Sequence, residues 1–224
     1  MIKTKKVGIL MVLAMIFAIL FGACGDAGGD AGGDLGEPDE VPNYPAGEGP
    51  GYYKVGEKGP GGGVIIYYDP DGFEVEGYGK ANYLQAAPED SIYDGGWGAH
   101  GTLISGITTF TSDTDPLASK IGNGWKDTQL IVAHMNANGI SSTAAQVCAA
   151  ANFGGLNDWF LPSAGELNQL CLNRALVENM EEPFYWSSSQ YHENSAWIQH
   201  FDGSKVQAYD GKSYSNPVRA IRAF

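Results

Sequence analysis

Cysteine is scarce in this sequence, and the three that are present lie far apart. Cys24, Cys148 and Cys171 include no pair spaced as Cys-x-x-Cys, which excludes the usual zinc-ribbon and thioredoxin-like redox motifs. Cys148 and Cys171 either form a disulfide in an oxidising compartment or remain as two buried thiols. The sequence leaves both possibilities open.

Basic residues are also scarce, because 13 lysines and arginines stand against 26 acids and give a formal charge of −13. Three of the lysines lie in residues 1–23, which hold no acid, so the chain without that segment carries −16. Residues 25–50 hold seven acids and no base, which leaves residues 51–224 at −9. A nucleic-acid partner needs lysine and arginine to neutralise its phosphates. We therefore expect no nucleic-acid partner.

Motifs for catalysis, metal binding and phosphate binding are absent as well. No histidine has metal-ligand spacing to another histidine or to a cysteine. The four histidines are His100, His134, His192 and His200. The serine run 187–189 lacks the Gly-x-Ser-x-Gly elbow, and the glycine run 61–63 lacks the Lys-Ser/Thr of a phosphate loop. The acids at 113 and 115 fit a solvated loop better than a calcium site. We expect no metal, no cofactor and no enzymatic activity.

The N-terminus has the order of a bacterial lipoprotein signal peptide. Three lysines precede an apolar run over residues 7–21, and two small residues then stand before Cys24. Residues 20–24 (LFGAC) resemble the lipobox, with Phe21 where leucine is usual. The run is shorter than the ~20 residues of a membrane-spanning helix, and the next charges are acidic, which favours cleavage over an uncleaved anchor. We expect residues 1–23 to be removed and Cys24 to carry lipid.

The segment after Cys24 is rich in glycine and aspartate and repeats Gly-Asp-Ala-Gly twice. Glycine is costly to order and the acids repel one another, so residues 24–50 are expected to be a flexible tether. Glycine at position 25, where aspartate would favour the inner membrane, favours the outer membrane. The expected location is the cell envelope, with the domain attached to the membrane through its lipid and exposed at the surface.

Residues 51–224 differ in composition and form the expected folded domain. An apolar, β-rich run over residues 64–68 predicts a buried strand, and residues 69–125 predict long loops with brief strands or turns. A helix is expected over residues 128–138 with Asp127 as its N-cap, and a second over residues 143–152.

A third helix is expected to begin with the capping box of Ser163 and Glu166, in which each side chain pairs with a backbone N–H at the helix start. Trp159, Trp186 and Trp197 are expected in the core.

The C-terminal third predicts β-structure. Residues 196–201 alternate in character, and the Asp-Gly pair at 202–203 predicts a hairpin turn. The chain then returns over residues 204–208, which places Val206 opposite Gln199.

The last predicted strand covers residues 218–224 and is expected to pair with the first. Alternation places Arg219 and Arg222 on opposite faces, one buried against Asp158 or Glu166 and the other exposed. The sequence thus predicts an α+β fold with small antiparallel sheets, two to three helices, and paired first and last strands.

Several motifs together resemble the Lcl C-terminal domain family. They span residues 51–224 and are found at residues 59–65, 157–163, 166–168, 185–189, 197, 201, 203 and 218–222. The resemblance implies a variant of the C-type-lectin-like fold, in which the predicted helix over residues 128–138 is an insertion. It also implies a surface or secreted binding module, adhesin-like and not enzymatic, with a host glycan or protein as ligand.

Some relatives in this family vary at selected positions around the C-terminal hairpin while the framework stays constant. Applied to this sequence, that arrangement implies a ligand-binding, hypervariable face made of Tyr191, His192, Asn194, Ile198, His200, Asp202, Tyr209, Asp210 and Tyr214. Two other functions remain open. Formylglycine-generating enzymes share the broader fold but need a reactive cysteine pair in a cleft, and an envelope protein can also be purely structural.

Overall fold

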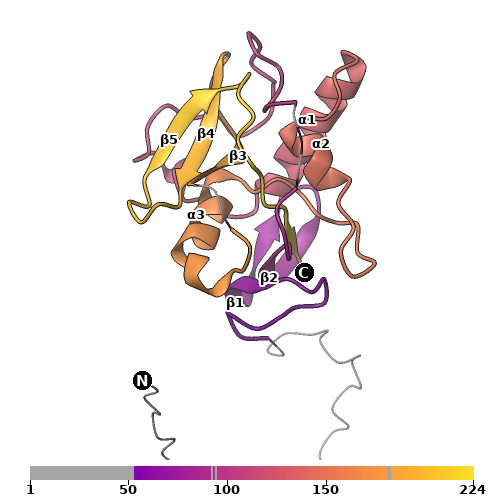
Figure 1. Cartoon of the computed structure of the whole chain (residues 1–224), viewed down its shortest axis with the longest axis vertical. Helices are drawn as coiled ribbons and strands as arrows, with labels where there is room; N and C mark the ends of the chain where they lie inside the picture. Colours follow the sequence, from indigo (N-terminus) through magenta and orange to yellow (C-terminus); the bar gives the residue numbers. More distant parts are fainter. Residues whose placement is uncertain (1–52, 92, 94, 181–182) are drawn as a thin grey trace, which may run out of the picture. The chain divides into compact units, whose positions relative to one another are not determined.

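The computed structural model describes residues 53–224 except residues 92, 94 and 181–182, so the expected signal peptide, Cys24 and the tether lie outside the described residues. The domain is α+β, as predicted, with three α-helices and two three-stranded antiparallel sheets (Figure 1). In chain order the elements are β1 (Ile65–Val75), β2 (Gly79–Ala86), η1 (Pro116–Ala118), α1 (Gly124–Ala137), α2 (Ala144–Ala149), α3 (Ala164–Leu172), η2 (Arg174–Leu176), β3 (Phe184–His192), β4 (Ser195–His200), β5 (Gln207–Gly211) and β6 (Ile221–Ala223).

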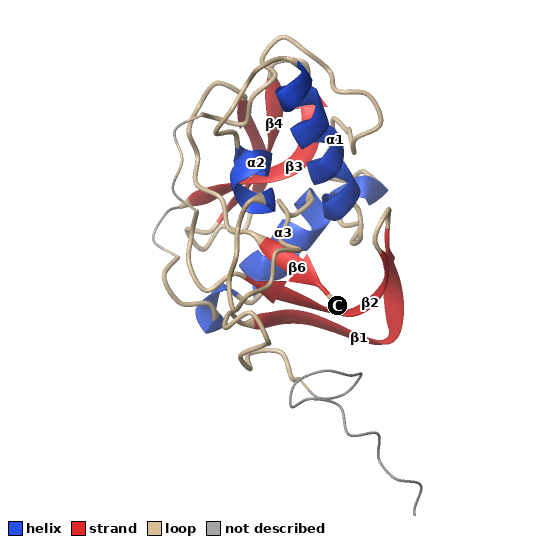
Figure 2. Ribbon diagram, turned by 90° about the vertical axis from the view of Figure 1, so that its right-hand side faces the viewer, coloured by secondary structure: helices blue, strands red, loops and turns tan. Residues whose placement is uncertain are grey.

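The first sheet brings the two ends of the domain together in the order β1-β2-β6 (Figure 2). The last strand pairs with β2, through Leu84 opposite Ala223, and not with the first strand as predicted. The expected loops after residue 68 are also corrected, because β1 continues to Val75 and turns directly into β2. A register shift between Tyr68 and Phe73 absorbs the Asp-Pro-Asp-Gly segment that had indicated a loop.

Helix α1 begins four residues earlier than predicted. Its N-cap is Asn123, and Asp127 lies inside the first turn, where its Oδ1 accepts a hydrogen bond of 3.0 Å from the Thr108 backbone N–H. The aspartate therefore fixes a distant loop instead of capping its own helix. Asn123 joins the same loop by donating from Nδ2 to Thr108 Oγ1 at 3.0 Å.

The other two helices start where the sequence indicates. Thr143 is the N-cap of α2, which ends at Ala149, shorter than predicted. The capping box of α3 is confirmed: Ser163 is the N-cap, and its backbone N–H donates to Glu166 Oε2 at 2.7 Å. The other carboxylate oxygen accepts from the Gly122 N–H at 2.8 Å, so the fully buried Glu166 also ties α3 to the segment before α1.

The second sheet has the order β3-β4-β5 and corrects the predicted hairpin register by one residue. Gln199 lies opposite Gln207, not Val206, and the return strand starts at Gln207. The connection is longer than a two-residue turn because Gly203 and Lys205 both adopt positive φ, at 98° and 56°. A one-residue shift changes the face on which each side chain of β5 lies.

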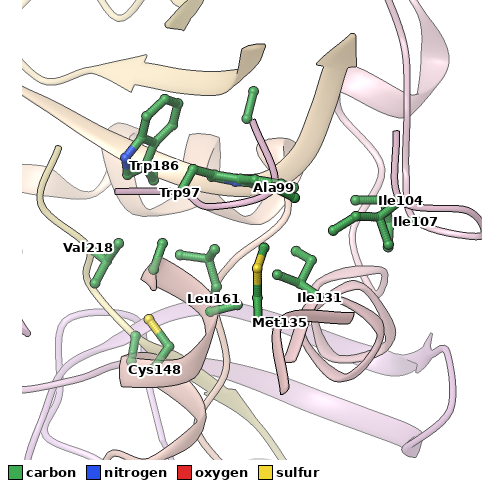
Figure 3. Packing of buried hydrophobic residues seen from close by; sticks show 14 of the residues in the cluster. Trp97, Ala99, Ile104, Ile107, Ile131, Met135, Cys148, Leu161, Trp186 and Val218 are labelled. Atoms are coloured by element: carbon green, nitrogen blue, oxygen red, sulfur yellow. The ribbon is translucent and has the colours of Figure 1, made fainter. Parts of the chain in front are cut away.

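Two large hydrophobic clusters fill the domain. One lies between α1, α2 and the second sheet, where Trp97 and Trp186 face Met135 of α1 and Cys148 of α2 (Figure 3). The other lies between the first sheet and α3 and contains Cys171.

Both thiols are free, and because they belong to separate clusters they remain as two buried cysteines, the second of the two possibilities. The prediction that Trp159, Trp186 and Trp197 are core residues is confirmed.

Both C-terminal arginines are buried, which corrects the expectation that one is exposed. Arg222 pairs with Asp158 through two bonds of 2.9 Å. Arg219 pairs with Asp90 and also donates to the backbone oxygens of Ala87, Glu178 and Asn179. Arginine has five N–H donors, so one side chain can satisfy several buried acceptors.

Candidate ligand-binding face

Three aromatic residues lie side by side across one face of the second sheet, one from each strand. Tyr191 of β3 and Tyr209 of β5 stack with ring centroids 3.9 Å apart and planes within 5°. Trp197 of β4 meets both edge-on, at 5.5 and 6.3 Å. Tyr209 is 53% exposed, whereas Trp197 is 3% exposed. The tyrosine pair therefore forms a partly exposed aromatic surface supported by a buried tryptophan.

Trp197 is held in place from below. Its ring stacks on Phe110 at 4.5 Å, and its indole Nε1 donates to the Phe110 backbone oxygen at 2.9 Å. The Phe110 N–H in turn donates to the Gln190 oxygen of β3 at 3.2 Å. The support of the tyrosine pair is thus fixed by hydrogen bonds as well as by packing.

The Tyr191 hydroxyl stays protonated over the physiological range. Desolvation and the neighbouring Tyr209 raise the pKa of Tyr191 above its ordinary value. Such a ring offers an apolar face together with a neutral hydroxyl, a combination common in protein recognition surfaces.

A cavity of about 380 Å³ opens where β5 begins. It is lined by Asp113, Ala118, Ser119, Asn168, Lys205, Val206 and Gln207. Gln207 Nε2 donates to the backbone oxygens of Ala118 and Ala164, each at 3.1 Å, so β5 is tied to both η1 and α3. Sequence reasoning did not identify this cavity because its residues come from four separate segments and share no spacing pattern.

The nine residues of the face implied by the family resemblance do not lie together. His192 and Asn194 lie at the β3–β4 turn, where the Asn194 N–H donates to His192 Nδ1 at 3.1 Å. His200 and Asp202 lie at the opposite end of β4, with Nδ1 and Oδ2 3.6 Å apart. Hydrogen bonds from Ser204 hold the pKa of Asp202 below its usual range.

The remaining members occupy other surroundings. Ile198 is 6% exposed and packs in the cluster with Trp97 and Trp186, so it is a core residue. Asp210 Oδ2 accepts from Asn216 Nδ2 at 2.9 Å, and Tyr214, 61% exposed, lies in the segment after β5. Of the nine, the structure places the ring of Tyr191 against two others: Tyr209, which stacks on it, and His192, whose centroid lies 5.0 Å away at 51°.

A buried lysine supports the far end of β5. Lys212 Nζ donates to the Thr102 backbone oxygen at 2.8 Å and to Gln190 Oε1 at 2.9 Å, and it lies 4.6 Å from the centroid of the Trp97 ring. Desolvation lowers its pKa to about 8. Lys212 links β5 to β3 and to the segment that precedes η1, which stabilises the strand carrying Tyr209.

The two described cysteines are buried thiols, and the acids are not grouped with them as metal ligands in the described residues. Burial raises the pKa of both Cys148 and Cys171, which keeps them in the unreactive thiol form. Within residues 53–224 as described, no three His, Cys, Asp or Glu side chains are grouped as metal ligands. Asp115 is the N-cap of η1, where its Oδ1 accepts from the Leu117 N–H at 2.9 Å.

The fold and this surface define a class of protein: an α+β domain with a supported aromatic face on a small antiparallel sheet. The model of the Lcl C-terminal domain family matches residues 107–222, and the chain belongs to that family. The match includes the second sheet and β6's first residues and leaves β1 and β2 outside it. Comparison with curated proteins gives no match. In the part of the chain that is described, no helix has the length and apolarity needed to cross a bilayer.

Proposed function

We propose that this chain is a cell-envelope lipoprotein that presents an adhesin-like, ligand-binding domain. The observation that carries the proposal is the partly exposed Tyr191–Tyr209 pair, held over the buried Trp197. Membership of the Lcl C-terminal domain family supports it. The ligand is a host glycan or protein, since tyrosine rings contact both kinds of molecule through their apolar faces and hydroxyls.

The membrane attachment rests on the sequence of residues 1–24, with lipid on Cys24 and the outer membrane as its location. Globomycin, which blocks the lipoprotein signal peptidase, tests it by blocking processing. A Cys24→Ser variant is expected to lose both processing and labelling by radioactive palmitate. Protease treatment of intact cells then tests surface exposure, because only a domain on the outer side is degraded.

The enzymatic alternative receives less support from the arrangement of the cysteines. A formylglycine-generating activity needs two reactive thiols in one cleft, and Cys148 and Cys171 belong to different hydrophobic clusters. A Cys148→Ser, Cys171→Ser double variant that keeps its ligand binding would agree with the binding module. A purely structural envelope protein predicts no soluble ligand at all.

An array of glycans and matrix proteins, probed with the detergent-solubilised lipoprotein, tests the binding function. We expect saturable binding to a small group of related ligands. The absence of binding to any glycan or matrix protein on the array would favour the structural alternative. Sequencing the gene from several isolates tests the hypervariable face, because substitutions should concentrate at exposed positions such as Tyr209 and Tyr214 and spare the buried Ile198.

A further inference from the structure

The two outer strands of the second sheet differ in how their free edges are covered. On the β3 side, Thr109 forms a parallel bridge with Gln190, and the Gln190 N–H donates to the Thr108 oxygen at 2.8 Å. Strand β5 lies at the opposite edge of the sheet (Figure 1). Among the described residues, no backbone group outside β4 is hydrogen-bonded to the main chain of Gln207 or Tyr209.

The register identifies which backbone groups of β5 point away from the sheet. The His200 N–H donates to the Val206 oxygen, and the Lys212 N–H donates to the Asn194 oxygen, both at 2.9 Å. Hydrogen-bonded and non-hydrogen-bonded pairs alternate along an antiparallel ladder. The pairs of Gln199 with Gln207 and of Trp197 with Tyr209 are therefore the non-hydrogen-bonded ones, and Gln207 and Tyr209 direct their N–H and C=O groups outward.

Two of the usual protections of a sheet edge, proline and lysine, are missing from β5. Proline, lysine and inward-pointing charges commonly prevent another strand from pairing at such an edge. The strand reads QAYDG and has neither proline nor lysine, and its one charged side chain, the half-buried Asp210, accepts a hydrogen bond of 2.9 Å from Asn216 Nδ2. Exposed apolar groups lie next to it and within it, since Val206 before the strand is 50% exposed and Tyr209 in the strand is 53% exposed, and the cavity beside Gln207 lies at its start.

We propose that β5 receives an extended, basic peptide segment of a protein partner as a fourth strand. In this mode of recognition, main-chain hydrogen bonds supply affinity and neighbouring side-chain contacts supply specificity. The charge favours a basic peptide over a second copy of the chain, because residues 51–224 carry −9 and two copies repel each other. The inference rests on the proposed binding function and names the ligand as protein, not glycan.

Amide hydrogen exchange on the full lipoprotein in detergent gives the first test. In the free protein, the N–H groups of Gln207 and Tyr209 should exchange fast, whereas those of Ala208 and Asp210, which face β4, should be protected. The probe is a set of short peptides selected on the protein from a phage-displayed random library. We expect the selected peptides to be basic and to slow exchange at Gln207 and Tyr209 by at least about tenfold.

Two substitutions at one position separate the backbone from the side chain. Tyr209→Ala removes the ring only, whereas Tyr209→Pro also removes the outward N–H, which β4 does not use. Both variants should stay folded, and the proline variant should bind the selected peptides about tenfold more weakly than the alanine variant. Ala208→Pro, which removes an inward N–H, is the control that should disrupt the hairpin.

Three outcomes would overturn the inference. The selection yields no binding peptide; bound peptides leave exchange at Gln207 and Tyr209 unchanged; or protection of these amides rises with protein concentration alone, which would identify a second copy as the occupant. Glycans that bind the array without changing exchange along β5 would refute the added strand while leaving the proposed binding function intact.

Discussion

At the scale of single residues, buried polar side chains join segments that are distant in sequence. Arg219 is an example, because it contacts Asp90 and the backbone oxygens of Ala87 and Asn179, which are about ninety residues apart in sequence. The carboxylates of Asp127 and Glu166 accept hydrogen bonds from backbone N–H groups of the loops around α1. Each of these side chains is fully buried, so losing its partners costs far more than losing a surface ion pair.

Replacing Arg219 with lysine should lower the free energy of unfolding by about 2–4 kcal/mol. The single ammonium group cannot reach Asp90 and the oxygens of Ala87 and Asn179 together. Urea denaturation measures the change. Arg174→Lys is the matched control, because Arg174 is half-buried and donates to the Met180 oxygen, and it should cost less than about 1 kcal/mol. Equal losses in both variants would contradict the assigned role of Arg219.

Asp127 should make the stability of the domain depend on pH. Burial raises its pKa from 3.8 to about 7, and its Oδ2 has no hydrogen-bond partner among the described residues. Because the folded-state pKa is the higher one, the folded state binds more protons between these values, and the free energy of unfolding contributed by Asp127 falls as pH rises from about 4 to about 7.

Asp127→Asn keeps an acceptor for the Thr108 N–H and removes the titration. The free energy of unfolding of the variant minus that of the unsubstituted protein should therefore rise by about 1–3 kcal/mol as the pH is raised from 4 to 8. Urea denaturation of both proteins at the two pH values measures the difference. A difference that does not change with pH would show that the folded-state pKa of Asp127 is ordinary.

At the scale of elements, the turn before β1 depends on close backbone approach. A Cβ at Gly63 would lie 1.8 Å from the Ala86 oxygen of β2, whereas a Cβ at Gly62 would meet nothing within 4 Å. Gly63→Ala should therefore cost about 3 kcal/mol or more, because β1 must move away from β2. Gly62→Ala should cost only about 1–2 kcal/mol, the strain of its φ of 80°. Thermal unfolding of the two variants compares them, and the reverse order would refute the predicted contact.

The type of an element was predictable from sequence where it depends on residues that are close together along the chain. The capping box of Ser163 and Glu166 and the alternation over residues 196–201 both depend on neighbours in sequence, and both correspond to elements of the structure. The start of α1 was misplaced because the Asp127 carboxylate bonds to Thr108, nineteen residues away, and not to its own helix. The β4–β5 register was wrong because Lys205 takes a left-handed conformation that its residue type does not indicate.

The candidate site was less predictable than the elements. Nine residues were expected to share a face, but ring contacts join only three of them, Tyr191 with Tyr209 and with His192. The face implied by the family resemblance includes Ile198, but both sides of β4 are covered, so Ile198 is buried. The cavity beside Gln207 and the unpaired edge of β5 arise from tertiary packing, which spacing along the chain does not record.

At the scale of the whole molecule, the proposed lipid anchor, the tether and the second sheet each have a role in presenting a ligand-binding surface. The lipid at Cys24 and the acidic tether are proposed to hold the domain away from the membrane, and the second sheet would carry its ligand-binding surface. The tyrosines of that surface are supported through Trp197 by Phe110 and β3, so a ligand would meet a preformed structure. Binding should thus depend on Tyr191 and Tyr209 and not on an exposed tyrosine beside the first sheet, such as Tyr78.

The most direct test measures the affinity of three variants of the solubilised lipoprotein for the ligands found on the array. Tyr191→Ala and Tyr209→Ala change the proposed surface, and Tyr78→Ala changes a tyrosine that is 39% exposed beside the first sheet. The account predicts that the first two variants bind about tenfold or more weakly and that the third binds as the unsubstituted protein does. Unchanged affinity in both sheet variants, with all three proteins folded, would contradict it.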